Sequence, residues 1–171
     1  VVIGQMHGSE PGGRAVVQDL ARLPVPRGVG LWLIPTMNPD GAAADRRTNA
    51  RGVDLNRNFP YKWGPIGVPG DGEYAGTGPA SEPETQAMIN FMQQLQPDIT
   101  LWYHQDLFRI SPSTGPDGPL RQRYAERTGL KYETISGPGS VYTGVAATWT
   151  RKTIPAGMSF VIELGPTLPA D

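Results

Sequence analysis

Two histidines and two glutamates are the side chains of this sequence best suited to chemistry. The 171 residues include only two histidines, His7 and His104, and each follows an apolar run that predicts a buried strand. Glu163 stands at the end of another such run, FVIEL. Because ligands bind outside the carboxyl ends of strands in open α/β sheets, we expect these three side chains to meet at one edge. A carboxylate in surroundings as apolar as those of Glu163 is costly unless it is paired or functional.

His7 and Glu10 form an H-x-x-E pair in the segment HGSEP. Gly8 allows a sharp turn out of the strand, and the spacing places both side chains on one side of that turn. Zinc accepts imidazole nitrogen and carboxylate oxygen, and catalytic sites use three protein ligands plus one open position. With His104 the pair would make a His₂Glu site for one Zn²⁺, and Glu163 would be the general base. H-x-x-E is also a common chance pattern, and Glu10 alone could be an acid favoured at a helix start.

The composition limits the classes of function. Fifteen basic and 16 acidic residues give a formal net charge of −1, which offers no electrostatic footprint for nucleic acid. No apolar run is long enough to cross a bilayer, so we expect no membrane span. The absence of cysteine excludes disulfides and thiolate zinc sites. No signal peptide is visible and the sequence starts without Met, so localisation and oligomeric state stay open.

The elements that must position these side chains alternate along the chain, which indicates a layered α/β domain. Apolar runs predict buried strands over residues 1–4, 29–35, 98–103 and 158–164. Helical spacing of apolar residues predicts helices over 12–23, 81–96, 119–128 and 143–152. Ser81 and Glu84 are interpreted as a capping box at the start of the second helix. Residues 36–80 show little periodicity, and so long a loop in a compact domain is usually functional.

Several motifs together resemble those of one known family. They are HGSE at 7–10, NPDG at 38–41, RTNARGVDLNRNFP at 47–60, SEPET at 81–85, the strand that ends in His104, and FVIEL at 160–164. In this order they resemble the zinc carboxypeptidase family of the carboxypeptidase A/B type, in particular its small bacterial branch with murein peptide amidases. The resemblance spans almost all of the chain.

The resemblance implies a role for each matching residue. His7, Glu10 and His104 would bind the single zinc ion. Glu163 would be the general base that activates zinc-bound water and later protonates the leaving amine.

Four further residues would contact the substrate. Arg47 matches the arginine that polarises the scissile carbonyl and stabilises the oxyanion. Asn56 and Arg57 match the pair that grips the terminal carboxylate. The family's mobile substrate-site tyrosine falls on Tyr142, by its position upstream of Trp149 and Glu163 alone.

The resemblance also implies one zinc peptidase catalytic domain over residues 1–171, with a three-layer α/β/α fold and a central mixed, mostly parallel sheet. The chain is short for the family and lacks its usual N-terminal helix and first strands. We therefore expect a sheet truncated at its edges, and the completeness of the N-terminus stays open. Localisation stays open between the bacterial cytoplasm and export.

The function implied is zinc-dependent hydrolysis of a peptide or amide bond next to a free carboxylate, with a peptide or muropeptide as substrate. One alternative is an N-acyl amino acid deacylase of the aspartoacylase or succinylglutamate desuccinylase type, although NPDG and SEPET favour the peptidase. A non-catalytic binding module is a further alternative.

The segment between Tyr142 and Glu163 shapes the family's pocket for the last side chain of the substrate. Here it reads GVAATWTRKTIPAG and contains no acid, which argues against a preference for Lys or Arg side chains. Thr148 is a candidate pocket residue. Arg151 and Lys152 would favour an acidic or amino-carboxylate group, as in diaminopimelate, unless they are solvated cations at a helix end, which is the commoner situation.

Overall fold

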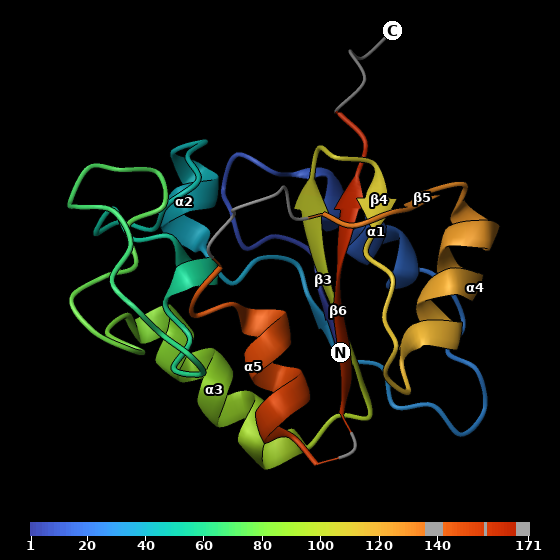
Figure 1. Ribbon diagram of the computed structural model, residues 1–171. Helices are drawn as coiled ribbons and strands as arrows, with labels where there is room; N and C mark the ends of the chain where they lie inside the picture. The colour runs from blue at the N-terminus through green and yellow to red at the C-terminus, as the bar shows by residue number, and fades with distance from the viewer. Residues whose placement is uncertain (136–141, 156, 167–171) are drawn as a thin grey trace, which may run out of the picture.

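The computed structural model describes residues 1–135, 142–155 and 157–166. Its centre is a six-stranded sheet in the order β2-β1-β3-β6-β4-β5 (Figure 1). The strands are β1 (Val2–Ile3), β2 (Leu33–Ile34), β3 (Ile99–Gln105), β4 (Arg109–Ile110), β5 (Lys131–Tyr132) and β6 (Met158–Leu164). All neighbouring pairs are parallel except β4 and β6, which are antiparallel. The expected mixed, mostly parallel sheet is therefore confirmed.

Helices cover both faces of the sheet, which gives three layers (Figure 1). One face carries α1 (Gly12–Leu20) and α4 (Gly118–Thr128), and the other carries α3 (Pro83–Leu95) and α5 (Ala146–Thr153). Side chains alternate between the faces along each strand. Trp102 thus packs in the cluster with α3 and α5, whereas its neighbour Tyr103 packs in the cluster with α1. In the part of the chain that is described, no helix is both long and apolar enough to span a bilayer.

Four helices and four strands fall within or overlap the ranges that the sequence predicts. The elements that sequence periodicity did not predict are the two short strands β4 and β5, helix α2 (Pro39–Ala43) and the 3₁₀ helix η1 (Leu55–Arg57). Elements of two to five residues are too short to show a period, and long-range pairing decides them.

Two details of the predicted strands are wrong. Residues 29–35 are not a buried strand, because only Leu33–Ile34 pair with β1, and Val29 and Trp32 are about half exposed. The segment lies at the edge of the described sheet, where one side has no strand to cover it. His104 lies within β3 rather than after it.

The predicted capping box is also wrong. Helix α3 begins at Pro83, its N-cap is Glu82, and that residue makes no side-chain capping hydrogen bond. Proline is favoured in the first helical turn because its missing N–H has no helical acceptor there. Ser81 instead accepts a hydrogen bond from Asn58 at 2.9 Å, and Glu84 accepts one from Asn49 at 3.1 Å. The SEPET segment therefore holds the loop before and after η1.

Candidate active site

The carboxyl ends of three neighbouring parallel strands bring the predicted residues together. His7 follows β1, His104 lies near the end of β3, and Glu163 lies near the end of β6. The register of β3 and β6 places His104 directly beside Glu163. These two residues are far apart in the sequence, and only the pairing of the two strands makes them neighbours.

His7, Glu10 and His104 form a compact, buried cluster. Glu10 Oε1 lies 2.8 Å from His7 Nδ1, and Glu10 Oε2 lies 2.9 Å from His104 Nδ1. The two Nδ1 atoms are 3.2 Å apart. Donors that share one zinc ion at about 2.0–2.2 Å lie roughly 3–3.5 Å from one another, so this set fits zinc with little rearrangement. Potential ligand atoms from all three residues lie within 4.8 Å of one another.

The loop that carries His7 and Glu10 depends on close backbone packing. A Cβ on Gly8 would lie 2.0 Å from the carbonyl carbon and oxygen of Gly41. Glycine is therefore required because the two backbone segments lie in contact, and not only because the chain turns there. Asn38 holds the same junction, because its side chain donates to the carbonyl of Met6 at 3.0 Å and accepts from the N–H of Gly41 at 3.0 Å. The NPDG segment thereby fixes the position of the HGSE loop.

The carboxylate of Glu163 is buried and only partly hydrogen-bonded. It is 8% exposed, and its Oε2 is buried with no hydrogen-bond partner among the described residues. Burial raises the pKa of Glu163, and the nearby charge of His104 opposes this only in part. A carboxylate whose pKa is raised takes up a proton more readily, which suits a group that must accept a proton and return it.

Asn56 and Arg57 lie side by side on η1, and both are nearly buried. Asn56 Oδ1 accepts from the N–H of Ala146 at 3.1 Å, so its amide donors are turned away from α5. Arg57 donates from Nη2 to Glu73 at 2.7 Å, and Glu73 has a largely exposed side chain. An exposed surface carboxylate therefore already occupies one donor of Arg57. The exposed ring of Tyr142 packs on Arg57, with its centroid 5.0 Å from Cζ.

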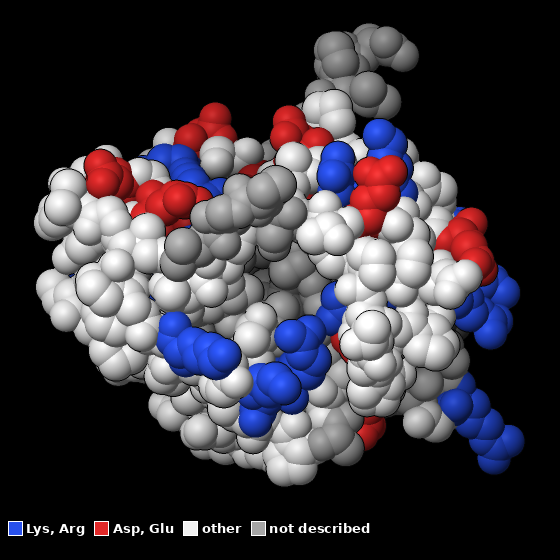
Figure 2. All heavy atoms as spheres, viewed as in Figure 1, with Lys and Arg blue, Asp and Glu red and all other residues white. Residues whose placement is uncertain are grey.

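One cavity of about 520 Å³ joins these residues. It is lined by all eight residues to which the family resemblance gives a metal-binding, catalytic or substrate-binding role: His7, Glu10, Arg47, Asn56, Arg57, His104, Tyr142 and Glu163. Figure 2 shows the hollow on this face, with basic side chains gathered along its lower rim over α5. The structure thus brings the whole predicted set to one opening.

Known proteins share these sequence features. A family model described as zinc carboxypeptidase matches residues 1–111, well over half of the chain. The chain belongs to the zinc carboxypeptidase family. This membership and the His₂Glu cluster agree with zinc as the cofactor.

The relatives of this chain include bacterial amidases. Murein peptide amidase A of Escherichia coli (strain K12) is 31% identical over 118 residues, which cover 63% of this chain and 49% of the relative. The crystal structure of murein-tripeptide amidase from Escherichia coli O157 superposes with a TM-score of 0.80 at 26% identity, covering 98% of this chain and 73% of that one. Carboxypeptidase A from Helicoverpa armigera shares the fold, with a TM-score of 0.74 at 19% identity over 99% of this chain and 53% of that one. The chain spans about half the length of the curated relative.

Asp54 is a residue of this candidate site that sequence reasoning missed. Its Oδ1 lies 2.9 Å from His7 Nε2, and its Oδ2 accepts from Arg47 Nε at 3.0 Å and Nη2 at 2.8 Å. Although burial raises the pKa of Asp54, the charges of His7 and Arg47 outweigh it and hold the pKa far below the usual range. Carboxylates behind metal-binding histidines fix the ring orientation and tautomer. Asp54 could have been found in the sequence, because it begins the DLNR segment that also contains Asn56 and Arg57.

Arg47 is held between two carboxylates. Besides Asp54, it donates from Nη1 to Glu10 Oε1 at 3.2 Å. About a third of its side chain remains exposed to the cavity. Its guanidinium therefore lies beside the metal cluster and retains a face toward solvent.

Proposed function

We propose that this protein hydrolyses a peptide or amide bond adjacent to a free carboxylate, with zinc as cofactor. The observation that carries the proposal is the buried carboxylate of Glu163 beside the His7–Glu10–His104 cluster, in the cavity that also contains Arg57; its Oε2 has no hydrogen-bond partner among the described residues. A general base, a metal site and a carboxylate anchor in one cavity are what such a reaction needs.

The proposed binding step rests on Asn56 and Arg57. The N–H groups of both side chains donate to the free carboxylate of the substrate, which takes the place of the Glu73 side chain on Arg57 Nη2. Two donors from adjacent residues fix the orientation of that carboxylate as well as its position. Tyr142, packed on Arg57, then covers the bound group. The bond to be cut is thereby placed toward the metal cluster.

The proposed chemical step rests on Glu163 and Arg47. When bound to His7, Glu10 and His104, zinc supplies a Lewis acid that polarises the scissile carbonyl and acidifies water. Glu163 removes a proton from the attacking water and delivers it to the leaving nitrogen. Arg47 donates hydrogen bonds to the oxygen that becomes negative, and Asp54 keeps its guanidinium in place.

The relatives narrow the proposed substrate class. Two of them carry the names murein peptide amidase and murein-tripeptide amidase, at 31% and 26% identity. We therefore propose a peptide or muropeptide as substrate, and metallocarboxypeptidase or amidase as the activity.

A Glu163→Gln variant tests the reaction. Loss of the base should reduce kcat by about 10²–10⁴-fold. Zinc content should stay at wild-type level, because Glu163 is not one of the three proposed ligands. Glu133→Gln, a change to an exposed glutamate, is the matched control and should keep full activity. The substrate panel should compare free-carboxylate peptides, their C-terminal amides and N-acyl amino acids, with zinc present. Full activity of Glu163→Gln would refute the proposed step, and exclusive cleavage of N-acyl amino acids would favour the deacylase instead.

A further inference from the structure

Gln105 follows His104 at the end of β3 and lines the active-site cavity. Its side-chain amide joins two segments that are far apart in the sequence, the start of α1 and the chain just after β6. The first segment follows Glu10 directly, and the second follows Glu163. One side chain therefore connects the part of the chain that carries a proposed metal ligand with the part that carries the proposed base.

The first contact of Gln105 caps helix α1. The N-cap residue of this helix is Pro11, whose side chain has no hydrogen-bonding group. Gln105 Oε1 instead accepts from the N–H of Gly12 at 2.6 Å, and the backbone N–H of Gln105 donates to Glu10 Oε2 at 3.2 Å. The first N–H groups of a helix have no acceptor within it, so an acceptor from another element fixes where the helix starts. Glu10 is thereby tied to the end of β3 through both its carboxylate and the helix that follows it.

The second contact of Gln105 reaches the strand that carries Glu163. The pairing of β3 with β6 ends at Gln105 and Leu164. Gln105 Nε2 donates to the carbonyl of Gly165 at 3.0 Å, one residue beyond that last pair. Gly165 lies two residues after Glu163, so this contact holds the end of β6 against β3 beside the proposed base.

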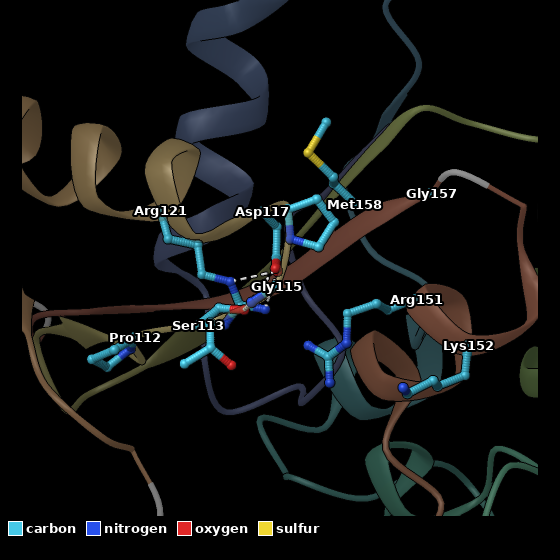
Figure 3. A pocket seen from close by; sticks show the side chains of 11 residues that line it. Pro112, Ser113, Gly115, Asp117, Arg121, Arg151, Lys152, Gly157 and Met158 are labelled. Carbon is cyan, nitrogen blue, oxygen red and sulfur yellow. Dashed lines mark hydrogen bonds and ion pairs between the residues drawn. The ribbon is translucent and has the colours of Figure 1, made fainter.

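The start of β6 is fixed separately, from a second cavity of about 730 Å³ (Figure 3). Arg121 in this cavity donates to Asp117 Oδ2 from Nε at 2.7 Å and to the carbonyl of Ser159 from Nη2 at 3.2 Å. Helix α5 supplies the opposite wall, where Arg151 lines both cavities and Lys152 lines only the second. The contacts of Arg121 hold β6 near its first residues, which leaves the end with the proposed base to the amide on β3.

We propose that Gln105 is a positioning residue, whose side-chain amide fixes the separation between the proposed metal ligand Glu10 and the proposed base Glu163. This inference rests on the proposed function for the role of Glu163. A primary amide has an acceptor at one end and a donor at the other, which matches the N–H of Gly12 and the carbonyl of Gly165. A carboxylate could satisfy only the N–H, and an apolar side chain could satisfy neither group.

The test compares wild type with Gln105→Met, which keeps the length of the side chain and removes both contacts. Gln105→Glu keeps the acceptor for Gly12 and removes the donor to Gly165. Gln122→Met is the matched control, because Gln122 is exposed on α4 and donates to Glu126 at 2.9 Å. Chelator competition would measure zinc affinity, and steady-state kinetics at saturating zinc would use the free-carboxylate peptide that wild type cleaves fastest. Gln105→Met would also be combined with Glu163→Gln.

Gln105→Met should weaken zinc binding by about 10-fold and lower kcat by about 10–100-fold, as expected when contacts behind a metal ligand or a catalytic group are lost. KM should stay within about two-fold, because Asn56 and Arg57 are untouched. Gln105→Glu should bind zinc at least as tightly as wild type and still show the lower kcat. In the Glu163→Gln background, Gln105→Met should change the residual kcat by less than about two-fold, because the group that it positions is already gone.

A merely structural role would lower stability and leave zinc affinity and kcat within two-fold of wild type in Gln105→Met, and that result would overturn the inference. An equal loss of kcat with and without Glu163 would overturn it as well. If wild type cleaves no peptide, the proposed function fails. In that case, weaker zinc binding by Gln105→Met that Gln105→Glu restores would still support the inference for Glu10, and unchanged zinc binding would overturn it.

Discussion

Replacing Asp54 by Asn should weaken zinc binding without altering any proposed ligand. Asp54 Oδ1 faces His7 Nε2 at 2.9 Å and also accepts from the N–H of Asn56 at 2.8 Å. In the variant, the amide oxygen can keep those two contacts only if its NH₂ group takes the place of Oδ2. That group would then face Arg47 Nε and Nη2, which now donate at 3.0 and 2.8 Å. Donors would oppose donors, so the variant must give up either the His7 contact or the Arg47 contact.

The expected magnitude follows from the two roles of Asp54. Loss of a carboxylate behind a metal-binding histidine typically lowers metal affinity by about 10–100-fold, or roughly 1.4–2.7 kcal/mol. Asp54 is fully buried and its charge is shared between His7 and Arg47, which places the expected loss toward the upper end of that range. Release of Arg47 should lower kcat in addition, because its donors would no longer be held beside the cluster.

Competition with a chromophoric chelator would measure the zinc affinity of wild type, Asp54→Asn and the control Asp19→Asn. Asp19 lies at the surface, where it pairs with Arg22, and its replacement should change zinc affinity by less than two-fold. Thermal unfolding of the metal-free proteins would show that the fold is retained. An Asp54→Asn protein that is folded and binds zinc within two-fold of wild type would refute the reasoning.

Three further predictions concern other contacts. Glu73→Gln should lower KM by about 1.5–5-fold with little change in kcat, because an ion pair whose carboxylate is largely exposed contributes about 0.2–1 kcal/mol and here competes with the substrate for Arg57. Gly8→Ala should destabilise the protein by at least about 1–3 kcal/mol in denaturant unfolding, because its Cβ would meet backbone at 2.0 Å. Asp117→Asn should cost about 3 kcal/mol, the lower end for a broken buried pair, because Arg121 keeps two carbonyl acceptors. Burial raises the pKa of Asp117, but hydrogen bonds from Ser113 and Arg121 outweigh burial and lower it. The ionised Asp117 therefore stabilises the folded protein fully above about pH 4. This contribution to the free energy of unfolding is lost as the pH falls through the lowered pKa.

Controls of the same chemistry separate these effects from general damage. Glu126→Gln removes another exposed carboxylate and should leave KM unchanged. Gly30→Ala adds a Cβ that meets nothing within 4 Å, so its stability should equal that of wild type or exceed it slightly. An unchanged KM in Glu73→Gln would mean that Glu73 does not occupy the substrate position. An Asp117→Asn defect that is as large at pH 3 as at pH 7 would contradict the proposed ionisation of that pair.

The sequence by itself determined the elements whose hydrophobic residues recur with a clear period. It also singled out the residues of chemically useful types that occur only rarely in the chain. Runs such as MSFVIEL and the helical spacing over 81–96 record which face of an element is buried, so strands and helices could be predicted locally. The scarcity of histidine singled out His7 and His104, and the family motifs supplied the substrate residues. Elements as short as β4 and β5 show no period, so they could not be predicted in this way.

Only the tertiary structure decided how these residues meet. The alignment of His104 with Glu163 depends on the register of β3 and β6, which no local pattern encodes. The contact of Asp54 with His7 joins residues 47 positions apart, across a loop without periodicity. The different places of Arg151 and Lys152 depend on how core side chains fix the rotation of α5. Sequence spacing specifies neighbours within one element, whereas a catalytic site is made between elements, where strand order and packing set the distances.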